Sequence, residues 1–298
     1  MKNPITLSAI AFLSIMTTYC AAQTPGAFSY NAGKFEIILL SEGQGNGSAS
    51  ILIGASNEMI GECLTDGTFP NATNAFLVRT PDKKNILVDA GYGTRLIENL
   101  KEYGVEASQI DAILITHAHG DHISGLLQEG KPVFPKATLY LSKLEYDYWT
   151  NDSEMNRMPE NRQGGFQKAR ETIAAYKDRL HLFQPTGIET QPTNLFDGVE
   201  AILAPGHTPG HTLYLIGSGK SKMLIWGDLT HAMTIQMPYP EVAVTYDVAP
   251  ELAVESRKKV LKYVVKNNIS VAGMHIPYPG MGTVAENGKG GYTFTPEK

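Results

Sequence analysis

Apolar runs alternate along the chain with segments of helical spacing. The runs are short and rich in β-branched and aromatic residues, as in buried strands, at 35–40, 75–79, 86–88, 110–116, 138–141, 199–203, 212–216 and 223–226. Apolar spacing predicts helices over 94–103, 166–179 and 251–266. Since strands and helices alternate in both halves, the pattern predicts a layered α/β fold.

A further helix is expected after Ser142, which forms an S-x-x-E capping signal with Glu145. The polar stretch after it, "WTNDSEMNRMPENRQGG" (149–165), predicts a surface loop within a helical cap at about 142–180. A simple exposed connector is the alternative. The segment "SEGQGNGSAS" (41–50) predicts a mobile loop, and a phosphate cradle is not expected because no Lys-Ser/Thr and no helix follow.

Composition places few limits on the protein. With 298 residues, of which 42% are hydrophobic and 18% charged, the chain can bury a sizeable core as one large domain or two small ones. The formal net charge is −5 and no basic block is present, which argues against nucleic acid as a partner.

The N-terminal segment differs in composition from the rest of the chain. Lys2, the apolar residues 5–16 and the small residues up to Ala22 predict a signal peptide over 1–22, and therefore export to the periplasm or the exterior. The apolar stretch is too short for a stable membrane span. Acylation of Cys20, which would give a lipoprotein, is a minor alternative because Tyr19 before it disfavours such processing.

Four metal-type ligands lie together in "ILITHAHGDHISG" (113–125), directly after an apolar run. In extended backbone His117 and His119 project to the same side and can bind one ion together. Asp121 and His122 follow Gly120, where the chain can turn, so their side chains can face a neighbouring position. More ligands in this region than one zinc ion takes would point to two ions.

Three more candidate ligands each follow a strand-like run. His207 stands in "LAPGHTPGHT", Asp228 in "LIWGDLTH" and His275 in "SVAGMHIPYPG". The same order of strand, turn and ligand recurs each time. It predicts that these side chains meet at one rim of one sheet system.

With H-x-H-x-D-H followed in order by His, Asp and His, the sequence resembles the metallo-β-lactamase superfamily over nearly the whole expected mature chain. The resemblance implies a four-layer αββα sandwich over 23–298, two divalent metal ions, most plausibly zinc, and a homodimer. By the same resemblance, His117, His119 and His207 would hold the first metal. Asp121, His122 and His275 would hold the second, and Asp228 would bridge both.

Two further residues take supporting roles by this resemblance. His211 in "GHTPGH" is expected to form structural hydrogen bonds rather than to bind metal. Asp89 in "LVDAG" is expected either to support a ligand histidine or to cap the following turn.

The bridging Asp228 separates branches of the superfamily, because true β-lactamases lack it. The context "APGHTPGHTLYLI…GDLTHAMTIQMP" resembles secreted N-acyl homoserine lactonases and methyl parathion hydrolase-like enzymes. The resemblance implies that a metal-bridging hydroxide opens a lactone of the quorum-quenching type. Hydrolysis of organophosphate triesters or aryl esters is the alternative.

The remaining expectations concern the substrate, a small acyl lactone or ester. Asp121 is expected to orient the hydroxide or deliver a proton to the leaving oxygen. His231 stands where many lactonases have a substrate-binding Tyr, and its imidazole could donate the same hydrogen bond. Trp149 and Met237 are expected to line an acyl-chain pocket, although core packing explains both equally well.

Overall fold

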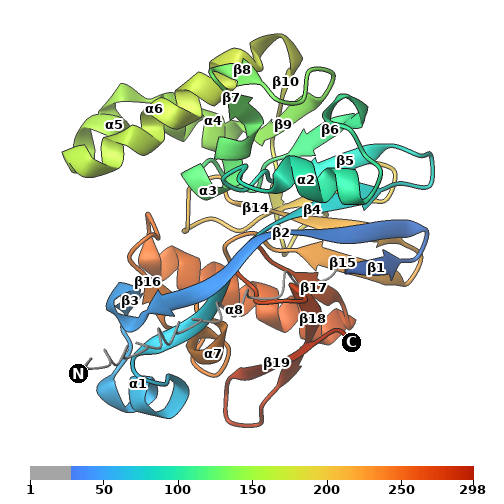
Figure 1. Cartoon of the computed structure of the whole chain (residues 1–298). Helices are drawn as coiled ribbons and strands as arrows, with labels where there is room; N and C mark the ends of the chain where they lie inside the picture. The colour runs from blue at the N-terminus through green and yellow to red at the C-terminus, as the bar shows by residue number, and fades with distance from the viewer. Residues whose placement is uncertain (1–27) are drawn as a thin grey trace, which may run out of the picture.

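Two mixed β-sheets pack face to face, and helices cover the outer face of each (Figure 1). The computed structural model describes residues 28–298, so the expected signal peptide lies outside the described residues. Among the helices of 28–298, none combines the length and the apolarity that a membrane crossing requires.

The first sheet has the order β1-β2-β4-β5-β6-β9-β10. Its strands are β1 (Ser29–Ala32), β2 (Phe35–Ser48), β4 (Thr68–Arg79), β5 (Asn85–Val88), β6 (Ala112–Leu114), β9 (Thr138–Ser142) and β10 (Leu180–Phe183). The second sheet runs β11-β13-β14-β15-β17-β18-β19, with β12 (Thr193–Phe196) also paired to β13. Its strands are β11 (Thr186–Gly187), β13 (Val199–Leu203), β14 (Thr212–Ser218), β15 (Ser221–Ile225), β17 (Ser270–Ala272), β18 (Met281–Glu286) and β19 (Tyr292–Pro296).

The helices lie on the two outer faces and at the sheet edge. They are α1 (Asn57–Cys63), α2 (Leu96–Glu102), α3 (Gly120–Ile123), α4 (Lys143–Thr150), α5 (Asp152–Arg157), α6 (Glu160–Ala175), α7 (Met233–Gln236) and α8 (Pro250–Asn267). Two short pairs, β3 (Leu52–Ile53) with β16 (Ala243–Val244) and β7 (Leu127–Gln128) with β8 (Lys131–Pro132), complete the described strands.

Strict alternation of apolar side chains creates the layers. Along β2, Ile38 and Leu40 face a core shared with α2, α4 and α6, whereas Ile37 and Leu39 face the core between the two sheets. The second sheet packs its other face against α8. Helix, sheet, sheet and helix therefore follow in order, which confirms the expected four-layer αββα sandwich.

Two local expectations are wrong. The segment 41–50 is no loop: β2 continues to Ser48 and pairs with β4 as far as Thr68, after a bulge at Glu42. The stretch 149–165 is largely helical, because the side chain of Asn151 caps α5 and α6 begins directly after Pro159. Backbone pairing and capping supply order that hydrophobic periodicity does not reveal.

The carboxyl ends of the central strands meet at one rim. In the first sheet, β5, β6 and β9 are parallel to one another. In the second, β15 is parallel to β17, and two successive antiparallel pairings give β13 the same direction as β15. Loops that follow these strands can therefore converge on one place.

Candidate metal centre

All seven predicted ligands converge at this rim. The loop after β6 carries His117, His119, Asp121 and His122, while His207, Asp228 and His275 follow β13, β15 and β17. Their donor atoms form two groups, and within each group the atoms lie within 4.8 Å of one another. Asp228 belongs to both groups. The turn at Gly120, which begins α3, divides the first cluster between the two groups as expected.

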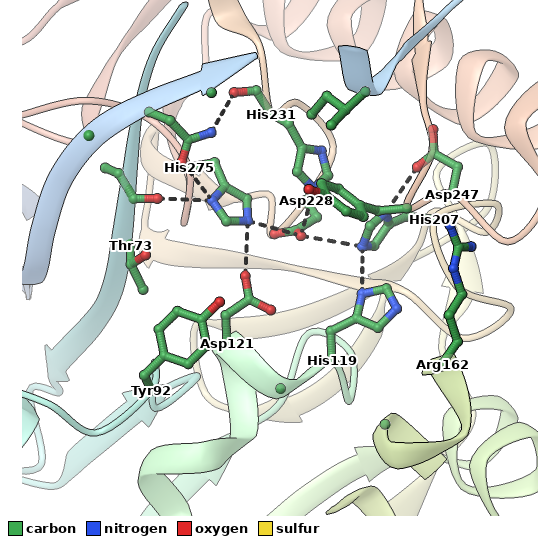
Figure 2. Close-up of a pocket in the computed structure, with 18 of the residues that line it drawn as sticks. Thr73, Tyr92, His119, Asp121, Arg162, His207, Asp228, His231, Asp247 and His275 are labelled. Atoms are coloured by element: carbon green, nitrogen blue, oxygen red, sulfur yellow. Dashed lines mark hydrogen bonds and ion pairs between the residues drawn. The ribbon is translucent and has the colours of Figure 1, made fainter. Parts of the chain in front are cut away.

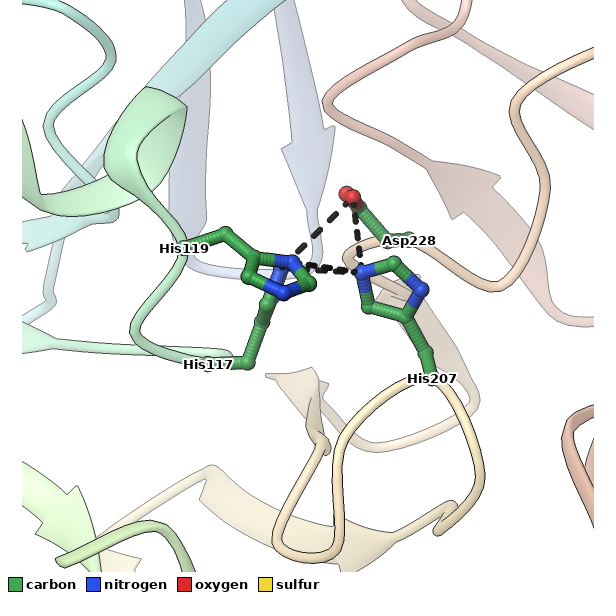
Figure 3. A group of neighbouring side chains, drawn as sticks. All are labelled: His117, His119, His207 and Asp228. Carbon is green, nitrogen blue, oxygen red and sulfur yellow. Dashed lines mark hydrogen bonds and ion pairs between the residues drawn. The ribbon is translucent and has the colours of Figure 1, made fainter. Parts of the chain in front are cut away.

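The first group places three imidazole nitrogens in a triangle (Figure 3). The Nε2 atom of His117, the Nδ1 atom of His119 and the Nε2 atom of His207 are 2.9, 3.0 and 3.1 Å apart. Oδ2 of Asp228 lies 3.3 Å from His207 and 3.6 Å from His117. Three nitrogens and one carboxylate around a common point match the ligand number and type of a tetrahedral zinc site.

The second group joins two imidazoles to two carboxylates. Nε2 of His122 lies 3.2 Å from Oδ1 of Asp228 and 3.7 Å from Oδ2 of Asp121. Nε2 of His275 lies 3.2 Å from Oδ2 of Asp228 and 3.4 Å from Oδ2 of Asp121. Asp228 thus lies between the groups: Oδ2 faces the first group and His275, and Oδ1 faces His122.

The protonation pattern of the rings suits metal binding. Nδ1 of His122 is 2.7 Å from Asp89, Nδ1 of His207 is 2.9 Å from Asp247, and Nδ1 of His275 is 2.9 Å from the carbonyl oxygen of Ala72. In the neutral form of each ring, an N–H at Nδ1 would donate to this acceptor and leave the lone pair of Nε2 facing the centre, ready to replace a proton with a metal ion.

Two buried polar atoms of the centre form no hydrogen bond within the described part of the chain. Nε2 of His122 and Oδ1 of Asp228 are buried 3.2 Å apart as an ion-pair contact, and neither forms a hydrogen bond with any residue of 28–298. Burying such atoms unsatisfied is costly, and a bound cation would satisfy both. The residues present therefore fit a pair of divalent metal ions.

The electrostatics of the centre favour added positive charge. Burial lowers the pKa of His275, but the carboxylates of Asp228 and Asp121 outweigh burial and raise it to about 10. For His119 the balance is the opposite: burial and His207 outweigh the two carboxylates and lower its pKa to about 3. A cation next to Asp121 and Asp228 is thus stabilised, and the imidazole of His119 stays neutral, as a ligand must be.

Asp89 and His211 have the supporting roles that the sequence predicts. Asp89 accepts from His122, so its supporting role is confirmed, and the carboxylate also accepts from the backbone and hydroxyl of Thr116. His211 bonds the carbonyl of Ala204 at 3.1 Å and accepts from the backbone N–H of Asp228 at 3.0 Å. That structural role is confirmed too, because it fixes the loop that carries the shared carboxylate.

Asp247 was missed from the sequence. It lies in the segment "TYDVAP", far along the chain from His207, and only the fold brings the two within 2.9 Å. Its other oxygen accepts from the backbone N–H of Val244 at 3.0 Å, which orients the carboxylate.

The centre forms the floor of a cavity of about 820 Å³ (Figure 2). We use "floor" for the seven side chains His117, His119, Asp121, His122, His207, Asp228 and His275. Tyr148, Trp149 and Phe166 of α4 and α6, which we name the aromatic wall, line one side. Trp149 packs edge-on against His119 with ring centroids 5.5 Å apart.

A second side of the cavity is the end of β2, where glycines alternate with Gln44, Asn46 and Ser48, and all of these residues line the cavity. Gly43, Gly45 and Gly47 of β2, which we name the glycine wall, pair with Thr73, Asn71 and Phe69 and share their face. A Cβ added at Gly43 or Gly45 would meet no atom within 4 Å, so these glycines leave that space to the cavity. In Figure 2 this strand is the light-blue ribbon at the upper left.

Of two substrate-side predictions, the one for Met237 is wrong and the one for His231 stays a prediction. Met237 is 3% exposed and packs in the core between the second sheet and α8; it is not among the residues of 28–298 that line the cavity. His231 does line it, but its Nε2 faces Oδ2 of Asp228 at 3.0 Å. Burial lowers the pKa of His231 to about 4, so the ring is neutral and carries one proton. Its Nδ1 atom has no hydrogen-bond partner among the described residues.

Comparison with known proteins bears on this centre. The family model described as "Metallo-beta-lactamase superfamily" matches residues 68–268, more than half of the chain. A probable metallo-hydrolase, YqgX from Bacillus subtilis (strain 168), is 30% identical over 161 residues, which cover 54% of this chain and 67% of that protein. A match to ribonuclease Z from Agathobacter rectalis covers only 13% of that relative.

Two solved structures are similar over nearly the whole chain. The hydrolase AbOPH is 29% identical with a TM-score of 0.83, covering 93% of this chain and 99% of its own. The dizinc quorum-quenching lactonase AidC is 28% identical with a TM-score of 0.81, covering 92% and 98%. With the paired ligand groups at the rim, these matches show that the chain is a metal-dependent hydrolase belonging to the metallo-beta-lactamase superfamily.

Proposed function

We propose that this enzyme opens the lactone ring of N-acyl homoserine lactones. The observation that carries the proposal is the combination of floor and walls in one cavity: a two-group metal centre below and an apolar enclosure beside it. A cavity of about 820 Å³ is of the size that holds a small molecule with an acyl chain. The similarity to AidC, whose structure holds an acyl-homoserine product, supports this substrate class.

Two divalent ions at the floor would supply Lewis acidity for a carbonyl oxygen and would make water a nucleophile at neutral pH. The chain's own residues have the remaining tasks. Asp121 presents a carboxylate with 22% of its side chain exposed, whereas the side chain of Asp228 is 2% exposed. Burial raises the pKa of Asp121, but His122 and His275 outweigh burial, so the group is ionised. We propose that it accepts the proton of the attacking water.

We propose that ring opening then takes place in the following order. The water oxygen adds to the lactone carbonyl carbon, the ring C–O bond breaks, and Asp121 returns its proton to the alkoxide that leaves. The products are an alcohol and a carboxylic acid, which ionises at neutral pH and releases one proton. The aromatic wall would hold the acyl chain while this occurs.

Proton release provides the test. Purified metal-loaded protein is expected to open hexanoyl-homoserine lactone with one proton released per ring, and a chelator is expected to abolish the reaction until metal is restored. Aryl phosphotriesters and aryl esters are assayed in parallel at the same metal loading. If the protein cleaves those and opens no lactone, the proposed substrate is wrong while the hydrolase class stands.

Three further proposals accompany this function. We propose zinc as the metal, supported by the His-rich first group and by the dizinc neighbour AidC. We propose export, supported by the sequence of residues 1–22, and a homodimer, as the sequence resemblance implies. Metal analysis of protein purified without added metal, N-terminal sequencing of the mature protein and sedimentation would test them in turn.

A further inference from the structure

Glu145 is a fully buried carboxylate on α4 that the chemistry above does not use. The expected capping box does not form in the way that the sequence predicts. The Oγ atom of Ser142 accepts from the N–H of Leu144, while Glu145 turns inward toward the metal centre. A charged side chain with no exposed surface needs compensating donors.

Three N–H groups donate to this carboxylate, and they come from three separate parts of the site. Oε2 accepts from the backbone N–H of Ala118 at 3.1 Å and from the indole N–H of Trp149 at 2.6 Å. Oε1 accepts from the backbone N–H of Gly210 at 2.9 Å. Ala118 stands between His117 and His119, and Gly210 lies in the turn that follows His207.

The turn at Gly210 is built to approach α4 closely. A Cβ at this position would overlap the backbone nitrogen and the Cγ atom of Glu145. Glycine therefore permits the contact that brings its N–H to the carboxylate. The glycine of "HTPG" is thus required for this close packing, and the sequence alone does not reveal that requirement.

These contacts favour one ligand group over the other. Glu145 holds the two loops next to the three histidines of the first group: Ala118 lies between His117 and His119, and Gly210 follows His207. Asp121 and His122 of the second group come later in the β6 loop, beyond the turn at Gly120. The second group is held elsewhere: Asp89 supports His122, and the carbonyl of Ala72 supports His275. The bond to Trp149 adds the aromatic wall to the first group, because the indole also packs on His119.

We propose that Glu145 is a positioning residue which holds the two loops of the first ligand group, together with Trp149, in the geometry that binds metal. It acts through backbone and indole N–H groups and touches neither substrate nor metal. The proposal rests on the metal centre alone and is independent of which substrate the enzyme hydrolyses.

Replacing Glu145 by Gln tests this with little change in size. One polar atom of the side chain becomes a donor, so at least one of the three N–H groups faces another donor and loses its acceptor. Residues that support metal ligands typically contribute about 10–100-fold to metal affinity. The readout is metal retention by zinc-loaded full-length protein during titration with a chelator, which needs no substrate.

Two matched backgrounds separate the ligand groups. In the His275→Ala background the first group remains complete, and E145Q is expected to weaken retention of its metal by about 10–100-fold. In the His119→Ala background the second group remains, and E145Q is expected to change its affinity by less than about threefold. Trp149→Phe removes only the indole donor and is expected to have the smaller effect in the first background.

The proposal is overturned if E145Q has no effect on the first group, or weakens both groups equally. Glu145→Asp serves as a second variant, because it keeps the charge but is too short to reach all three donors. If both variants lose their fold and metal content together, Glu145 is a general stability residue and the selective role is wrong. None of these measurements uses a lactone, so their results would stand even if the proposed substrate is wrong.

Discussion

The floor and the walls of the cavity are built by opposite means. The floor consists of polar side chains, most of them buried, and neighbouring carboxylates or a carbonyl fix the rings of His122, His207 and His275. The aromatic wall is apolar and packs by ring contacts, such as Trp149 on Phe166 at 4.7 Å. In the glycine wall, Gly43 and Gly45 contribute backbone and open space.

This difference separates the reaction from the choice of substrate. A change in the floor alters the charges that every substrate meets, so it should reduce the turnover of all substrates alike. A change in a wall alters only the space beside the reacting bond, so its effect should depend on the size of the acyl group. The ratio of kcat/KM between a long-chain and a short-chain lactone therefore distinguishes the two regions.

The largest effect is expected at Asp228, which both ligand groups share. Asp228→Ala removes the carboxylate between them and should reduce kcat/KM by at least about 10³-fold, or about 4 kcal/mol of transition-state stabilisation. Metal content should fall in parallel, and the long-to-short chain ratio should stay constant. The exposed Asp197→Ala is the control and should match the wild type. Full turnover by Asp228→Ala would contradict the shared role of this carboxylate.

A smaller loss is expected at Asp121, the part of the floor that reaches toward the cavity. Asp121→Asn keeps the size of the side chain but cannot accept a proton, so kcat should fall by about 10²–10³-fold. His122, His275 and Asp228 remain, so most of the metal should be retained. The measurement is kcat at fixed metal content across both chain lengths. A loss confined to long chains would place Asp121 with the walls and break the distinction.

The floor could be predicted from the sequence because its signals are local and chemical. "HAHGDH" places four ligands within six positions, and each of the other three follows an apolar run. Strand periodicity and chain direction then suffice to bring them to one rim. Asp247 could not be predicted in this way, because no short-range sequence pattern joins it to His207.

The walls could not be predicted in the same way. The glycines of 43–47 have the composition of a loop, and only pairing with β4 makes them a strand. Met237 was wrongly expected in the cavity, since periodicity cannot tell which of two apolar environments a side chain enters. Glu145 showed a cap signal on the correct helix, but its burial depends on the turn at Gly210, which comes from the other sheet.

The smallest effect, and the one that isolates a wall, is expected at Gly45. In Gly45→Val the added methyl groups enter open cavity space, and β-branched residues are favoured in strands, so stability should be retained. The kcat/KM for dodecanoyl-homoserine lactone should fall by about tenfold, while that for the butanoyl lactone should change little. Gly45→Ala should give an intermediate loss.

Gly61→Val is the matched control for this substitution. Gly61 lies on α1, a Cβ there would also meet nothing within 4 Å, and the residue is not among those of 28–298 that line the cavity. It should leave both lactones unaffected. If Gly45→Val instead lowered turnover of both chain lengths equally, the strand would influence the floor. The open space above β2 would then not be where chain length is selected.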